Sequence, residues 1–131
     1  MAFAINHIHL KSQDPGKTAD WWVKAFNFEI VRDAVRDTGD RFIACRSENG
    51  ITVNISGAQE GQKMGAGDAS VHEGLEHFGL DSENLEADIE RLTAIGAQLV
   101  EPPREAAPGV RICFVQAPDD VRIELIERKS S

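Results

Sequence analysis

The stretch His7-Ile8-His9-Leu10-Lys11-Ser12 returns seventy residues later as His77-Phe78-Gly79-Leu80-Asp81-Ser82. At the same offset, Ile51-Thr52-Val53-Asn54-Ile55 faces Val121-Arg122-Ile123-Glu124-Leu125, and no gap is needed from residue 5 to residue 126. Few residues are identical, so the match rests on the shared spacing of apolar positions. A match at one fixed offset predicts two copies of a single structural unit.

The first half is typical of a strand, a helix and three further strands. Apolar and polar residues alternate over 5–10, as in a half-buried strand. Asp14 and Pro15 are typical of a helix start, and Asn27 is expected to end that helix. The further strands predicted for this half are 28–31, 41–46 and 51–55, the last two joined by a turn at Asn49-Gly50.

The second half follows the same order. Strands are predicted at 76–80, 99–100, 111–116 and 121–126. A helix is predicted from about Ser82-Glu83 to Ile95, where Gly96 stops it, and a turn at Pro118-Asp119-Asp120. The predicted fold class is therefore α+β. Two β-α-β-β-β modules, 1–57 and 75–131, form one domain over 1–131, joined by a mobile linker at 58–74. Because such a unit has an open sheet edge, two copies are expected to close against each other.

Composition narrows the function classes. The chain has 131 residues, of which 41% are hydrophobic and 27% charged, and its net charge is -8. It contains no Lys/Arg-rich run, so a nucleic-acid partner is not expected. It has no apolar run of about 20 residues and no signal-peptide pattern, so no membrane span is expected. Cys45 and Cys113 lie in apolar runs, which is typical of buried, reduced thiols in a cytoplasmic protein.

Four polar side chains fall at matched positions of the repeat. His7 and His77 lie on the first strand of each half, whereas Asn54 and Glu124 lie on the last strand. In a two-fold arrangement these side chains are expected to converge. Two histidines and one carboxylate form a common three-ligand site for a divalent transition metal, with positions left open for substrate or water. Asn54 offers a weaker oxygen, so it is a possible fourth ligand, a substrate contact, or neither.

The metal interpretation has a competing, purely structural one. A lone His-x-His pair on a strand is often a surface feature, and an outward-pointing Glu124 would indicate no metal at all. An inward-pointing Glu124 would be costly without a cation or hydrogen bonds, and this favours the metal site. His9 shares the face of His7, so it is expected either to support the metal site or contact the substrate, or to be a structural or solvent-facing histidine. His72 is expected to be solvated unless the central loop folds over the cavity. Arg41 and Arg111 are expected to be strand-surface charges, with binding of an anionic substrate as the alternative.

Three segments resemble the vicinal oxygen chelate superfamily, which includes glyoxalases, bleomycin resistance proteins and dioxygenases. They are INHIHLKSQDPGKTADWW at 5–22, GLEHFGLDSENLEADIERLTAIGAQLV at 74–100 and ICFVQAPDDVRIELIE at 112–127. Together they cover nearly the whole chain. Each motif is loose, but the three in this order and spacing are fairly specific.

The resemblance implies two modules that form a cupped mixed sheet around a divalent metal held by His7, His77 and Glu124. It implies Lewis-acid catalysis of proton abstraction next to a carbonyl, with Glu124 as ligand, base or both. The activity would be that of a lyase, isomerase or epimerase of the glyoxalase (lactoylglutathione lyase) type. The metal would be Zn, Ni, Co, Mn or Fe, the substrate a small molecule with adjacent oxygens, and the assembly a homodimer.

Two departures keep alternatives open. Asn54 stands where glyoxalase I has a ligand glutamate. An amide ligand at this position is closer to the epimerase pattern. A ferrous-iron extradiol dioxygenase is the second hypothesis, because the same three ligands suit iron. It is weakened because such enzymes often use a tyrosine near the metal, and this chain has none. The third is a non-enzymatic, antibiotic-binding resistance protein, as found among metal-free members. The family's glycine after Pro118-Asp119 is Asp120 here, which is expected to alter only the turn.

Overall fold

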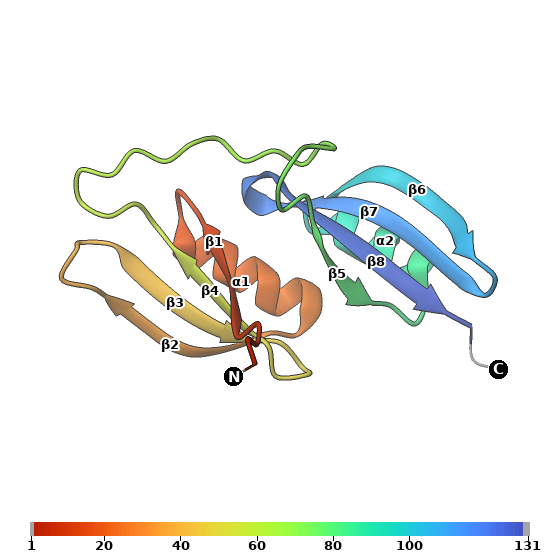
Figure 1. Ribbon diagram of the computed structural model, residues 1–131, viewed down its shortest axis with the longest axis horizontal. Coiled ribbons are helices and arrows are strands. Elements are labelled where there is room, and N and C mark those ends of the chain that lie inside the picture. Colours follow the sequence, from red (N-terminus) through yellow and green to blue (C-terminus); the bar gives the residue numbers. More distant parts are fainter. Residues whose placement is uncertain (1, 130–131) are drawn as a thin grey trace. The chain divides into compact units, whose positions relative to one another are not determined.

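The computed structural model describes residues 2–129 and divides into two compact units, one ending at Gly65 and one beginning at Ala66. Each unit contains one four-stranded mixed sheet with one helix packed on one face (Figure 1). The α+β class and the two predicted β-α-β-β-β modules are therefore confirmed. No helix in the described part of the chain is long and apolar enough to cross a membrane.

Both units have the same topology. The first consists of β1 (His7–Lys11), α1 (Pro15–Phe26), β2 (Glu29–Val35), β3 (Arg41–Arg46) and β4 (Thr52–Ser56), in the sheet order β1-β4-β3-β2. The second consists of β5 (Phe78–Asp81), α2 (Leu85–Ala94), β6 (Gln98–Ala107), β7 (Val110–Ala117), the short 3-10 turn η1 (Pro118–Asp120) and β8 (Val121–Arg128), in the order β5-β8-β7-β6. In each unit the first strand runs parallel to the last, and the other neighbours are antiparallel.

The helix ends show how local side chains set the boundaries. Helix α1 starts as predicted, since Asp14 accepts a hydrogen bond from the Lys17 amide, and it ends at Asn27, which adopts a left-handed φ of 58°. The start predicted for α2, at about Ser82-Glu83, is too early. Asn84 is the N-cap, and its side chain accepts a hydrogen bond from the Ala87 amide. The Ser82 hydroxyl accepts from the Asn84 amide, which lies before the first turn of the helix.

Strand β6 is much longer than predicted. It was expected at 99–100 only, yet it extends to Ala107 through Pro102 and Pro103. Proline cannot donate a ladder hydrogen bond, so it is tolerated only at sheet edges and bulges. Strand β6 is an edge strand, and its register with β7 shifts between Glu101 and Arg104, which takes both prolines out of regular pairing.

The core lies between each sheet and its helix. In the first unit Trp22 is fully buried and stacks on Phe28 with ring centroids 5.4 Å apart; in the second, Leu85 and Leu92 of α2 are fully buried. Cys45 and Cys113 are buried and free, as expected, and burial raises the pKa of each thiol to about 11. Because strand side chains alternate, the opposite face of each sheet carries the other set of side chains, which includes His9 and Asn54 in the first unit and Phe114 and Glu124 in the second.

Because of one buried carboxylate outside the core, the free energy of unfolding of the first unit should vary with pH in the acid range. Asp40 is 2% exposed, accepts from both Arg36 Nε and Nη2 and from the Thr38 hydroxyl, and its pKa is lowered to about 2, mainly by Arg36. A depressed folded-state pKa stabilises the fold above the ordinary value of 3.8, and this stabilisation is lost as pH falls toward 2.

Asp40→Asn should therefore lower the melting temperature at pH 7, and the gap to wild type should shrink between about pH 4 and pH 2. Thermal unfolding followed by circular dichroism measures both. The exposed neighbour Asp37 supplies the control, Asp37→Asn, which should leave the melting temperature nearly unchanged. A gap of constant size across this pH range would contradict the assignment.

Candidate functional site

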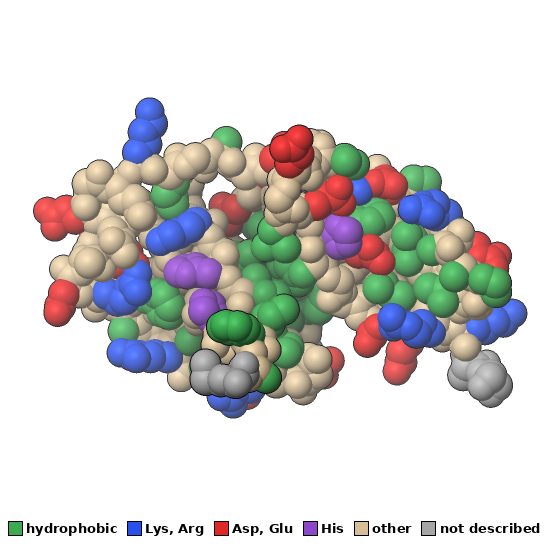
Figure 2. All heavy atoms as spheres, in the orientation of Figure 1, with side chains coloured by type: hydrophobic (Ala, Val, Ile, Leu, Met, Phe, Trp, Pro, Cys, Tyr) green, Lys and Arg blue, Asp and Glu red, His purple; other side chains and the backbone are tan. Residues whose placement is uncertain are grey.

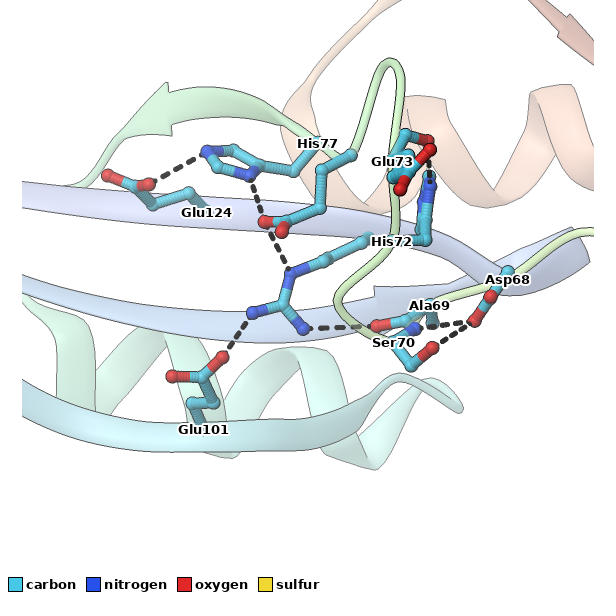
Figure 3. A network of polar contacts seen from close by, with 10 residues as sticks. Asp68, Ala69, Ser70, His72, Glu73, His77, Glu101 and Glu124 are labelled. Atoms are coloured by element: carbon cyan, nitrogen blue, oxygen red, sulfur yellow. Dashed lines mark hydrogen bonds and ion pairs between the residues drawn. The ribbon is translucent and has the colours of Figure 1, made fainter.

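The imidazole of His77 lies between two carboxylates in the second unit (Figure 3). Its Nδ1 is 2.9 Å from Glu76 Oε1, and its Nε2 is 2.9 Å from Glu124 Oε2. His77 directly precedes β5, and Glu124 lies in β8, the parallel neighbour of β5. The structure thus brings together two of the three predicted ligands, His77 and Glu124.

Strand alternation places Glu124 on the open face of its sheet. Ile123 and Leu125 are 0% and 1% exposed on the helix side, so Glu124 and Arg122 point to the other face. There the Glu124 side chain is only 16% exposed. Phe114, its partner on β7, packs edge-on against the His77 ring at 5.0 Å. Glu124 is therefore neither in the helix-side core nor freely solvated.

The two contacts of His77 restrict its proton arrangement. A neutral imidazole donates through one nitrogen and accepts through the other. The hydrogen bond with His77, helped by the charge of Arg122, holds the pKa of Glu76 below its ordinary value, so Glu76 is an ionised acceptor for Nδ1–H. In the neutral ring the Nε2 lone pair then faces a Glu124 oxygen. Two acceptors at this distance need a proton or a cation between them.

This donor pair fits a divalent transition metal. A histidine nitrogen and a carboxylate oxygen are donors that divalent transition metals bind in proteins. The separation of Nε2 and Oε2 is 2.9 Å. A metal-binding histidine usually donates its other ring N–H to a carboxylate, which fixes its tautomer and orientation. Glu76 stands in that position toward His77.

A buried arginine supports Glu76 from below. Arg122 is 3% exposed; its Nε lies 3.3 Å from Glu76 Oε1, and its Nη1 donates to the Ala69 carbonyl at 3.1 Å. Its Nη2 pairs with Glu101, and its guanidinium lies 4.1 Å above the Phe114 ring. Figure 3 shows this network joining the segment before β5 to β6 and β8.

The first unit contains a matching arrangement at His7. This exposed histidine has its Nδ1 2.5 Å from Asn6 Oδ1, so the residue before the histidine again holds Nδ1 and leaves Nε2 free for a ligand. Asn54 is half-buried on β4 beside His9. Within residues 2–129 the Asn54 amide has no side-chain hydrogen bond, so it is available to a ligand.

The other residues noted in the sequence take structural contacts. His9 Nε2 lies 2.7 Å from the buried Ser56 hydroxyl, and His72 Nδ1 lies 2.8 Å from the Glu73 carbonyl oxygen. Arg41 pairs with Asp33, and Arg111 pairs with Glu86 and Glu127, as expected of strand-surface charges.

His7 and Asn54 belong to the first unit, and His77 and Glu124 to the second. Among residues 2–129, no group of three His, Cys, Asp or Glu side chains lies close enough to hold a metal.

Glu76, Arg122 and Glu101 were missed at the level of sequence. For Glu76 a signal exists, because the repeat aligns Asn6-His7 with Glu76-His77 and puts an oxygen-bearing side chain before each histidine. For Arg122 and Glu101 there is none, because their contacts cross from one strand to another and leave no spacing pattern.

Several solved structures share the fold. A glyoxalase family protein from Bacillus cereus has a TM-score of 0.84 at 13% identity, covering 99% of this chain and 97% of that one. A variant of the fosfomycin resistance protein FosX from Listeria monocytogenes, complexed with Mn(II) and 1S,2S-dihydroxypropylphosphonic acid, has a TM-score of 0.71 at 21% identity, covering 100% and 95%. Glyoxalase I from Zea mays has a TM-score of 0.74 at 20% identity, covering 97% of this chain but 45% of that one.

At these identities the likeness concerns the fold alone, and no curated protein matches the chain. The family model described as Glyoxalase/Bleomycin resistance protein/Dioxygenase superfamily matches residues 4–125, which cover most of both units and include His7, Asn54, His77 and Glu124. The chain therefore belongs to the glyoxalase/bleomycin resistance protein/dioxygenase superfamily.

Proposed function

We propose that this protein is a divalent-metal-dependent enzyme of the glyoxalase type, acting on a small molecule with two adjacent oxygens. The observation that carries the proposal is the pair formed by His77 Nε2 and Glu124 Oε2, 2.9 Å apart, with the other ring nitrogen held by Glu76. The Mn(II) complex of the FosX variant, which has the same fold, gives independent support for a divalent cation.

The proposed ligands are His7, His77 and Glu124, with Asn54 as a fourth ligand or a substrate contact. His7 is supported by its contact with Asn6, which repeats the arrangement at His77. Asn54 is supported by its half-buried position on the open face of the first sheet. A His₂-carboxylate set leaves coordination positions open for two substrate oxygens.

The proposed chemistry is proton abstraction from a carbon next to a carbonyl. When bound, a divalent transition metal would supply Lewis acidity toward adjacent substrate oxygens. Glu124 directs Oε2 toward His77, and its Oε1 has no hydrogen bond among the described residues, so Oε1 is the free base. Its carboxylate takes the proton and returns it, to a neighbouring atom in an isomerisation or to the opposite face of the same carbon in an epimerisation. In a lyase reaction the electron pair left on carbon instead expels a group from the adjacent atom.

The same three donors also suit ferrous iron, so a ring-cleaving dioxygenase is the second candidate. Metal analysis of the purified protein together with oxygen uptake separates the two. Iron with oxygen uptake would favour the dioxygenase, and another divalent metal without oxygen uptake the isomerase or lyase. A metal-free protein that binds an antibiotic would instead point to a resistance protein.

Metal content tests the ligand set directly. His77→Ala and Glu124→Ala should each reduce bound metal at least tenfold relative to wild type, because each removes one of three protein ligands. Inductively coupled plasma mass spectrometry after dialysis measures this. The control is His72→Ala, which removes a histidine of the same unit that has no contact with His77. Full occupancy in both ligand variants would end the proposal.

Glu76→Gln tests the supporting carboxylate. It keeps the side-chain shape but replaces an ionised acceptor of the His77 N–H, so metal affinity should fall by about 10–100-fold. Competition with a chromogenic chelator measures the affinity, and Glu73→Gln, an exposed change in the same segment, is the control. Unchanged affinity in a folded Glu76→Gln protein would show that Glu76 does not position His77.

We also propose a homodimer in a reducing, cytoplasmic compartment. The exposure of Phe3 and Ile5, 97% and 91%, supports a partner surface, and the two buried free thiols support the compartment. Light scattering after gel filtration should give the mass of two chains, and a Phe3→Ser, Ile5→Ser double variant should shift it toward one. A single-chain mass for the wild type would contradict the dimer.

A further inference from the structure

The open face of the first sheet has a cluster of basic and polar side chains at one end. We define the basic corner as His9, Lys11, Arg36 and Ser56. His9 and Lys11 are two residues apart on β1 and share a face, and Ser56 of β4 is the register partner of Lys11. Figure 2 shows histidine side chains beside Lys or Arg side chains on this unit.

The polar contacts of the corner converge on one hydroxyl. Ser56 is 0% exposed, and its Oγ lies 2.7 Å from His9 Nε2 and 3.0 Å from Lys11 Nζ. The Lys11 ammonium also donates to the Gly57 carbonyl at 3.0 Å. An ammonium has three donors, so one remains. None of the ion pairs among residues 2–129 involves Lys11, so its charge is not neutralised by a carboxylate.

Arg36 lies near His9 because both side chains pack against Phe42. The Arg36 guanidinium lies 4.4 Å above the Phe42 ring, and the His9 ring packs edge-on against that ring at 5.5 Å. Asp40 balances the charge of Arg36, and no carboxylate balances Lys11. The excess is therefore positive, in a chain whose net charge is -8.

The second unit shows that the fold does not require this cluster. At the repeat offset, His9, Lys11 and Ser56 correspond to Gly79, Asp81 and Ile126. The second unit thus forms the same strand pair with a glycine, an aspartate and an isoleucine at these three positions. Asp81 pairs with Arg128 at 2.7 Å, so that corner is neutralised. The basic corner is specific to the first unit and is free to serve a ligand.

We propose that the basic corner binds the oxyanion group of the substrate, a carboxylate or a phosphonate. Lys11 donates its remaining N–H to the anion. The buried Ser56 hydroxyl accepts from Lys11 and donates to His9 Nε2, which leaves the Nδ1–H of the neutral ring for the anion. Charge-assisted hydrogen bonds such as that from Lys11 are the strong ones. This inference rests on the proposed function, because it takes the anion as part of the substrate. Its location supports that, since His9 pairs in register with Asn54 and shares a face with His7.

Anion titration of the full chain tests the proposal. Amide NMR spectra of the protein, freed of metal by chelation, are followed during addition of methylphosphonate or acetate at low ionic strength. Wild type should show saturable shifts in β1 and β4, and Lys11→Met should weaken binding at least tenfold, or about 1.4 kcal/mol. The control is Lys17→Met on exposed α1, which has the same net charge and should bind within twofold of wild type.

The two probes separate the sources of the anion: tighter methylphosphonate indicates a dianionic group and tighter acetate a carboxylate. No saturable shifts in wild type, or equal weakening in both lysine variants, would overturn the inference. A protein that keeps its metal yet binds neither anion overturns this inference alone. A protein that binds an anion in the basic corner but never binds metal overturns the proposed function and its metal site instead.

Discussion

The contact between His77 Nδ1 and Glu76 is the interaction on which the candidate site depends. It fixes which nitrogen carries the proton and so presents the lone pair of Nε2 to Glu124. Glu76 keeps its charge because Arg122, buried under it, lies within ion-pair distance. Without the positive charge of Arg122, the ionised form of Glu76 would be less stabilised, and Glu76 would hold the His77 ring less firmly in its orientation. The site is thus built from the sheet upward, from an arginine on β8 to an imidazole at the start of β5.

Duplication explains why the two units agree on one face and differ on the other. The helix side of each sheet is apolar and fully packed in both units, because that burial stabilises both copies. The open face does not have this constraint. There the first unit carries His9, Lys11 and Asn54, where the second carries Gly79, Asp81 and Glu124. In the proposed function, the second unit supplies the carboxylate base and the first supplies contacts to the substrate.

The sequence allowed the fold to be predicted well because apolar spacing repeats over the whole chain. Boundaries were less predictable where two signals competed. Ser82 and Asn84 are both good N-caps, and only the hydrogen bond to Ala87 decides for Asn84. Strand β6 was predicted too short, because nothing in the sequence marks it as an edge strand, where prolines are tolerated. His77 and Glu124 were predictable from the repeat, whereas Arg122 acts through contacts across strands, which spacing does not reveal.

The central claim is that a cation, and not only a proton, belongs between His77 Nε2 and Glu124. Crystals of the protein grown with Mn(II) and measured near the manganese absorption edge test this most directly. The account predicts one anomalous peak within about 2.2 Å of both donor atoms, with the Nδ1 contact to Glu76 preserved. No peak at this position, with Nε2 still bonded directly to the Glu124 carboxylate, would contradict it.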